Sequence, residues 1–239
     1  MALELFSNNT YLRPGISTVL SASGGVEPYV YSILSGGGSV TASGKYTTPI
    51  DGTYGRAVVQ VMDDNGATAG ISISTVGIVE LMCQILQKEL GLSNGRVWLY
   101  NQKIEEPKDQ GLYIVIRESS CKSFANNIRY ASGSGLDGVQ SSNFRSILSI
   151  DIKSRGLDAM RRKEEVVMAL GGQYAVQMQE LNSFRIGKVP NEIPNIGELD
   201  GSAIPYRFNI TVNVQYSVTK TQSTQYFDTF SGVELFTND

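Results

Sequence analysis

One segment of the chain has the spacing of a nucleotide-binding site. Residues Gly133 to Gly138 match the G-x-G-x-x-G fingerprint, and they follow a strand-like segment. That fingerprint requires a helix whose N-terminus receives the pyrophosphate, whereas residues 139–142 lead into another strand-like segment at 144–152. We therefore interpret residues 131–142 as a mobile hairpin loop and expect no bound dinucleotide.

Other residue types that perform chemistry are absent or scattered. The chain has no histidine, which excludes Ser-His-Asp triads, Cys-His pairs and His-ligated metal sites. Cys83 and Cys121 lack the CxxC spacing of zinc ribbons and redox motifs, although a single disulfide between them stays open. No pair of carboxylates has the spacing of a general acid and base; they are Glu105, Glu106, Asp109, Asp137, Asp151 and Asp158. We expect a non-enzymatic protein with no catalytic residue, no cofactor and no metal.

The composition favours a folded, soluble chain with one large domain or two modest ones. Of its 239 residues, 41% are hydrophobic and 18% charged, which is too apolar for a disordered chain. The net charge of −3 argues against nucleic-acid binding driven by a global positive field, although a local basic patch stays allowed. No secretory leader and no apolar run of membrane-spanning length is present, so we expect synthesis in the cytosol and no membrane partner.

The first third of the chain, residues 1–76, has the pattern of a small all-β sandwich. Short alternating or β-branched segments are separated by turn residues, and Asn65-Gly66 between two such segments predicts a hairpin. Asp63, Asp64 and Asn65 could also begin a calcium loop, but the glutamate that closes such a loop is missing, so a turn is favoured.

The remaining residues, 77–239, predict an α+β domain with two main helices and a mixed or antiparallel sheet. An apolar stripe with helical spacing, ending before Gly91, indicates the first helix; its members are Val79, Met82, Cys83, Leu86 and Leu90. A second helix is predicted over 157–182, with a bend or a close backbone approach at Gly171-Gly172. Strands are expected at 96–100, 111–118, 123–130, 143–154 and 206–218.

The last of these strands is unusually long. Its alternation directs Phe208, Ile210, Val212, Val214, Tyr216 and Val218 to one face. Thirteen residues at about 3.3 Å each span some 40 Å, which suggests a strand that crosses a subunit boundary. The strand at 122–130 alternates aromatic and basic residues, a pattern that could suit nucleic acid, but we interpret it as an ordinary sheet face.

Two segments of the N-terminal part resemble a known module. The runs PYVYSILSGGGSVTASGKYTTP and GTYGRAVVQVMDDNGATA are similar to the bacterial immunoglobulin-like modules attached to phage and surface proteins. The resemblance covers about residues 10–75. It implies an immunoglobulin-like sandwich that binds proteins or sugars, or acts as a spacer.

The C-terminal part resembles the neck or tail-terminator (tail-completion) proteins of long-tailed bacteriophages. The resemblance rests on the order of the elements and on several phrases: Leu90-Gly91, Leu112 to Arg117, Ser149 to Gly156, Glu164 to Leu170, and Arg207 to Val212. It implies a hexameric ring at the head-proximal end of the tail, which ends growth of the tube and joins the tail to the head connector. The implied partners are further copies of the chain, tube, connector and sheath proteins. DNA passes through such a ring without being read in sequence, and the location is the virion, assembled in the bacterial cytoplasm.

Two segments are candidates for contacts between subunits, because extended chain can add to a neighbour's open sheet edge. They are the loop 131–142 and the tail 219–239, and the expected contact residues are Ser134, Leu136, Asp137, Gln140, Tyr226, Phe227, Phe230 and Phe236. The apolar groups of the tail would dock on another subunit or on the tube, or pack within their own subunit. Two alternatives to the terminator stay open: another neck or tail-tube component, and a surface adhesin or decoration protein that binds host glycans through the sandwich.

Overall fold

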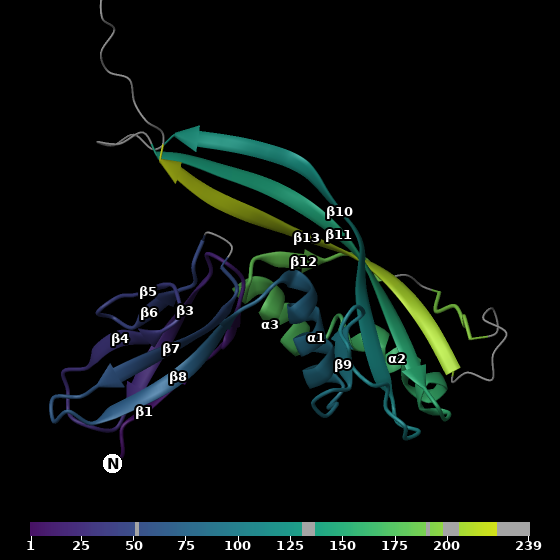
Figure 1. Ribbon diagram of the computed structural model, residues 1–239, viewed down its shortest axis with the longest axis horizontal. Coiled ribbons are helices and arrows are strands. Elements are labelled where there is room, and N and C mark those ends of the chain that lie inside the picture. Colours follow the sequence, from purple (N-terminus) through teal and green to yellow (C-terminus); the bar gives the residue numbers. More distant parts are fainter. Residues whose placement is uncertain (51–52, 131–136, 190–191, 198–205, 224–239) are drawn as a thin grey trace, which may run out of the picture.

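The computed structural model describes residues 1–50, 53–130, 137–189, 192–197 and 206–223. The chain is a mixed α+β protein dominated by β-sheet, which confirms the class expected from the sequence. An N-terminal pair of sheets is followed by a five-stranded sheet with helices against it (Figure 1).

Two four-stranded sheets face each other in the N-terminal part and form a sandwich. Their strands are β1 (Glu4–Ser7), β2 (Tyr11–Leu12), β3 (Ser17–Ser23), β4 (Val30–Ser35), β5 (Ser39–Val40), β6 (Lys45–Thr47), β7 (Gly55–Met62) and β8 (Thr68–Thr75). One sheet has the order β1-β3-β6-β5 and the other β2-β8-β7-β4. Leu20 and Tyr46 of the first sheet share a buried core with Val59 and Ile73 of the second. Burial of these alternate side chains holds the two sheets together.

The predicted hairpin joins β7 to β8, and its turn is built around a buried carboxylate. Gly66 has φ = 80°, a conformation that glycine adopts without steric cost. Asp63 Oδ1 accepts hydrogen bonds from the backbone N–H groups of Asn65 (3.1 Å) and Ala67 (2.7 Å), and Oδ2 accepts one from Val26 (3.0 Å). Backbone donors therefore satisfy the Asp63 carboxylate, and the prediction of a turn is confirmed.

The second sheet has the order β12-β13-β11-β10-β9, and three of its strands are very long. Its members are β9 (Val97–Leu99), β10 (Tyr113–Tyr130), β11 (Asp137–Ser154), β12 (Phe184–Ile186) and β13 (Tyr206–Ser223). β10, β11 and β13 have 18 residues each. β11 is the middle strand and pairs antiparallel with both β10 and β13, while β9 runs parallel to β10. The two strands predicted at 111–118 and 123–130 are thus one strand, interrupted by irregularities at Glu118/Ser120 and Ser123/Ala125.

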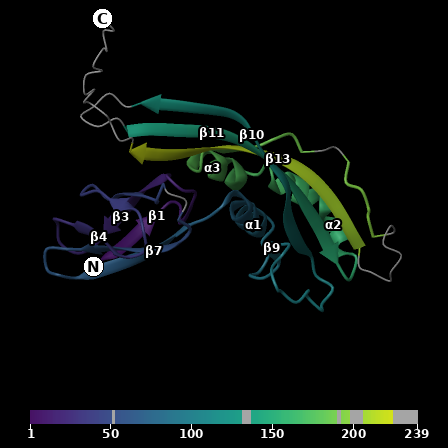
Figure 2. The ribbon, with the colours of Figure 1, turned by 45° about the horizontal axis from the view of Figure 1, so that its top comes forward.

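The first predicted helix is present as α1 (Ile78–Glu89). Leu81, Met82 and Leu86 are fully buried, and Gly91 follows the helix with φ = 61°, as the apolar stripe and the terminal glycine predicted. Figure 2 shows α1 beneath the sheet, between the sandwich and α2.

The single helix predicted over 157–182 was wrong. Two helices occupy this segment, α2 (Asp158–Ala169) and α3 (Gln173–Leu181), so the described residues contain three helices instead of two main ones. The helix is interrupted at Gly171-Gly172. Just after this pair, Glu89 Oε1 accepts hydrogen bonds from the backbone N–H groups of Tyr174 (2.7 Å) and Ala175 (3.2 Å). A Cβ on Gly172 would lie 2.5 Å from the Glu89 carboxylate. The glycine pair thus permits a close approach at which α1 caps α3.

All three helices cover one face of the sheet. Their apolar residues form one core with alternate residues of β10, β11 and β13, including Ile114, Ile150 and Val212. On the opposite face, Trp98 stacks on Tyr113 with ring centroids 5.3 Å apart. The core ends where the three long strands leave the helices.

Candidate assembly interface

Three strands continue past the helices as a projecting arm. We define the arm as residues 121–130 of β10, 137–145 of β11 and 215–223 of β13. Figure 1 shows it curving away from the helices and passing over the sandwich, and Figure 2 shows the same arrangement from a second side. At about 3.3 Å per residue, an 18-residue strand spans roughly 60 Å, far beyond the usual length of three to ten residues.

Both long edges of the arm lack a partner strand within the described residues. β9 pairs with β10 at Ile114 to Ile116, and β12 pairs with β13 at Val214 to Tyr216. Beyond these points, residues 118–130 of β10 and 218–223 of β13 have no strand on their outer sides in the part of the chain that the structure describes. An open edge is a template for pairing with another chain. The strand predicted at 206–218 is therefore part of a longer strand, and its open edge lies at the end, over residues 218–223.

The arm buries little of its own surface. Phe124, Ile128 and Val218 expose 55%, 53% and 43% of their area. The alternation predicted for β13 is correct through Tyr216, but Val218 lies past the helices and meets no core. The arm is therefore held by strand pairing and by contacts at its root.

Tyr216 anchors the root of the arm. Its ring stacks on Phe144 at 5.8 Å, and its hydroxyl lies 3.3 Å from Ser146 Oγ and 3.6 Å from Cys121 Sγ. Ser146 Oγ donates a hydrogen bond of 2.5 Å to Glu118. Burial raises the pKa of Tyr216 to about 12, so its phenol stays protonated near neutral pH. This polar cluster fixes side chains at the root.

Arg13 joins the sandwich to the root of the arm. It exposes only 5% of its area, and its guanidinium donates to the backbone carbonyls of Asn182 (3.0 Å), Ser183 (3.1 Å) and Ser217 (2.7 Å). The guanidinium also lies 4.7 Å from the ring centroid of Tyr216. Burial lowers the pKa of Arg13 from its ordinary value, and the carbonyls and the ring compensate for the lost hydration.

Asn182 completes this junction from the other side. It is fully buried, and its Oδ1 accepts the backbone N–H of Arg13 at 2.9 Å. Its Nδ2 donates to the carbonyl of Tyr11 at 3.4 Å. Sequence reasoning missed both Arg13 and Asn182, because the two residues are 169 positions apart and neither belongs to a periodic pattern.

Two clefts flank the arm. One, of about 510 Å³, lies where the arm leaves α3 and β12, and its lining includes Phe124, Val176 and Arg185. The other, of about 430 Å³, lies between the sandwich and the arm, with Ile50 on one side and Lys220 on the other. Both are bounded by arm residues, so a chain that docked on the arm would also contact them.

The predicted contact residues divide into two groups. Asp137 and Gln140 were expected in a loop, but residues 137–142 belong to β11, where Gln140 pairs with Ile128 and Lys220. Residues 219–223, expected in a tail, belong to β13. The other predicted contacts lie outside the described residues: Ser134, Leu136, Tyr226, Phe227, Phe230 and Phe236. The predicted loop thus ended too late and the predicted tail began too early, because residues 137–142 and 219–223 are paired strand.

The candidate chemical groups are isolated from one another. Cys83 and Cys121 are both free, and burial raises the pKa of Cys83 to about 12, as its place on the apolar helix face predicted. Among the described residues, no three metal-ligating side chains gather in one place. Asp151 pairs with Arg207 at 2.9 Å, and Glu106 pairs with Lys153 at 3.3 Å, so these two carboxylates act as structural partners.

The sandwich offers little aromatic surface. A glycan-binding sandwich would use its tyrosines, but Tyr46 is fully buried, Tyr11, Tyr29 and Tyr31 are partly buried, and Tyr54 is exposed. A glycan site would need several exposed aromatic side chains close together, which these five residues do not provide.

No protein-family model matches the chain, and a comparison with curated proteins gave no match. Within the described residues, none of the helices has the length and apolar character needed to cross a membrane.

Proposed function

We propose that this chain is a non-enzymatic structural subunit that assembles into a closed ring in the virion of a long-tailed bacteriophage. The observation that carries the proposal is the arm, with one open edge on β10 and another on β13. These edges lie on opposite sides of the arm. A subunit therefore offers two different surfaces, each suited to strand addition.

Pairing β10 of one copy with β13 of the next would join the arms into one continuous sheet. Both strands pair antiparallel with β11, so they run in the same direction within the arm. A contact between two different edges is heterologous, and a heterologous contact whose rotation closes makes a ring. Self-pairing of identical edges would instead give a two-fold dimer.

The phage assignment is supported by the resemblance of the C-terminal part to tail-terminator proteins, above all at Ser149 to Gly156. In this proposal the five-stranded sheet and its helices form a tail-terminator-like domain, and the sandwich is an immunoglobulin-like module. Six copies cap the tail tube, end its growth and offer a surface to the head connector. The junction at Arg13 supports a sandwich that acts as part of the ring subunit, because it fixes the module to the root of the arm.

Two single-cysteine variants test the head-to-tail contact. One chain carries Ile128→Cys and the other Val218→Cys, both in a Cys121→Ser background; Cys83 is buried and stays in place. The proposal predicts particles near 156 kDa, six times 26.0 kDa, by mass photometry. A short bismaleimide should then crosslink the mixture of the two variants and leave each variant alone uncrosslinked.

Equal crosslinking within either variant alone would indicate a two-fold contact and contradict the ring. A monomer that gives no crosslinks at high concentration would contradict self-assembly through the arm. As a matched control, Leu34→Cys and Met168→Cys place thiols at exposed apolar positions away from the arm, with exposed fractions of 61% and 73%. Their mixture should not crosslink.

Tails assembled with and without the chain test the terminator role. Tubes of normal length formed without the chain would contradict that role.

A further inference from the structure

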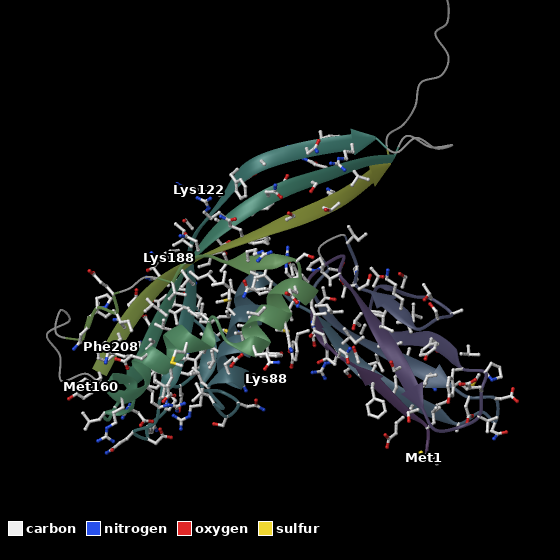
Figure 3. All side chains as sticks on the ribbon, turned by 180° about the vertical axis from the view of Figure 1, so that it is seen from behind. Met1, Lys88, Lys122, Met160, Lys188 and Phe208 are labelled. Carbon is white, nitrogen blue, oxygen red and sulfur yellow. The ribbon has the colours of Figure 1, made fainter. Side chains whose placement is uncertain are left out.

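The two faces of the arm differ in charge. The register pairs Lys122 directly with Arg145, which places both side chains on the face opposite to Tyr216. Arg129, which pairs with Val139, and Arg117, which pairs with Ser149 below the arm, lie on the same face. We call these four residues the basic face. Figure 3 shows Lys122 at the root of the arm on the side away from the sandwich.

No carboxylate whose side chain the structure describes pairs with the basic face. All four residues are exposed. Glu118 pairs with Leu148 and so belongs to the opposite face, where it accepts a hydrogen bond from Ser146. Like charges directly across a strand pair, as at Lys122 and Arg145, destabilise the sheet unless an anion lies between them.

Most neighbours of these cations are polar and uncharged; the register also places Val139 and Asp137 on this face. The arm positions that share this face include Asn127, Asn143, Gln215, Ser217 and Thr219. Serine, threonine, asparagine and glutamine side chains, together with arginine and lysine, make most protein contacts to phosphate oxygens. From Arg117 to Arg129 the face extends for about 35–40 Å along the strand, close to one helical turn of B-DNA at about 34 Å.

We infer that the basic face binds the phosphate backbone of double-stranded DNA without regard to sequence. This goes beyond ring assembly, because it concerns a face of the arm while assembly uses its edges. The aromatic side chain that is exposed beside this face, Phe124, lies 5.5 Å beneath the guanidinium of Arg145. With its ring face covered, it is a poor platform for base stacking, which favours duplex over single-stranded nucleic acid.

An acidic protein segment is the competing partner. Residues 224–239 carry Asp228, Glu234 and Asp239, but they also carry several large apolar side chains that would need apolar surface. The apolar side chains at the basic face are Val139 and Phe124, and Arg145 lies over the Phe124 ring, whereas the exposed apolar groups Ile128 and Val218 lie on the opposite face. The basic face therefore fits phosphates better than an acidic and aromatic peptide.

The test measures binding of the full chain to a fluorescein-labelled random 30-base-pair duplex by anisotropy at several salt concentrations. If four cations contact phosphates, the slope of log K against log salt is about −3.6, and affinity falls roughly 150-fold from 50 to 200 mM salt. The triple variant Lys122→Gln/Arg129→Gln/Arg145→Gln retains one of the four cations. We expect its slope to be about −0.9 and its affinity to fall only about 3- to 4-fold over the same range.

The matched control is Lys45→Gln/Lys103→Gln/Lys108→Gln, which changes the formal charge equally but removes exposed cations that lie outside the arm. It should bind like the unmodified chain, and circular dichroism should show both variants folded. Absence of duplex binding at 50 mM salt, or equal loss in both triple variants, overturns the inference. The inference is also overturned if a labelled peptide of residues 224–239 binds to the basic face and the duplex does not. Particle mass, measured on the same samples, reports ring assembly independently of DNA.

Discussion

Replacement of Arg13 tests whether the sandwich and the arm are one mechanical unit. Arg13→Ala removes a buried guanidinium that donates to three carbonyl oxygens, at 3.0, 3.1 and 2.7 Å. Hydrogen bonds to charged groups contribute about 1.5–3 kcal/mol each, which gives a gross loss of about 4.5–9 kcal/mol. Ser183 and Ser217 are exposed, so water replaces part of that loss. The variant also no longer desolvates a charge on folding, and we expect a net destabilisation of about 3 kcal/mol.

The assay measures thermal unfolding by differential scanning calorimetry. For a chain of this length, about 3 kcal/mol corresponds to a fall in Tm of roughly 6–12 °C if the protein unfolds as one unit. If the junction alone couples the two parts, the single transition separates into two. Arg13→Lys keeps the charge but lacks the planar fork that reaches several carbonyls, so its loss should be intermediate.

Hydrogen exchange locates the effect. Amides near Ser217 should exchange faster in Arg13→Ala, because the arm loses a contact at its root. Arg56→Ala is the matched control, since Arg56 is an exposed arginine of the same sandwich. A Tm for Arg13→Ala within about 1 °C of the control, with unchanged exchange near Ser217, would refute the idea that this junction holds the sandwich to the arm.

Three smaller changes test local features. Gly172→Ala should destabilise by about 1–2 kcal/mol in urea unfolding, because its Cβ displaces the carboxylate that caps α3, whereas Gly171→Ala, which meets only one atom at 3.8 Å, should not. Asp63→Ala should cost about 1–3 kcal/mol through three lost backbone hydrogen bonds, with the exposed Asp64→Ala nearly neutral by the same measurement. Burial raises the pKa of the Cys83 thiol to about 12, so a thiol reagent at pH 8 should titrate Cys83 only after denaturation.

Regular burial is what the sequence predicts well. The helical stripe that ends before Gly91 and the alternation of Phe208 to Tyr216 both follow from side chains meeting one core, and both were confirmed. The continuity of β10 was not predictable, because the irregularity at Ser123/Ala125 interrupts its alternation where no core supports it. At Gly171-Gly172 a bend or a close backbone approach was expected; the close approach is confirmed, but the helix break was not predictable because its cause is Glu89, a residue of another helix.

The sequence predicted only part of the candidate interface, because some of its contacts join segments that are distant in the chain. The sequence directed attention to a long strand and to the neighbouring segments, and residues 137–142 and 219–223 proved to be strand. Nothing local marks Arg13, whose partners come from α3, the turn before β12 and β13. A contact between distant segments leaves no period in the sequence, so it becomes visible only when the fold brings the segments together.

The two proposals, ring assembly and DNA binding, are linked by one physical constraint on the arm. Each ordered residue costs about 1–2 kcal/mol of backbone entropy, and sheets recover that cost mainly by burying a face. The arm exposes Phe124, Ile128 and Val218, and its like-charged pair Lys122 and Arg145 adds a penalty. Strand pairing alone recovers little of this cost, so the proposed partners at the edges and on the basic face would add the free energy that keeps the arm ordered. In a ring, neighbouring copies would supply strands to the edges of the arm, and DNA would supply negative charge to the basic face. Either contact would order the arm for the other. Ring assembly and DNA binding should therefore strengthen one another.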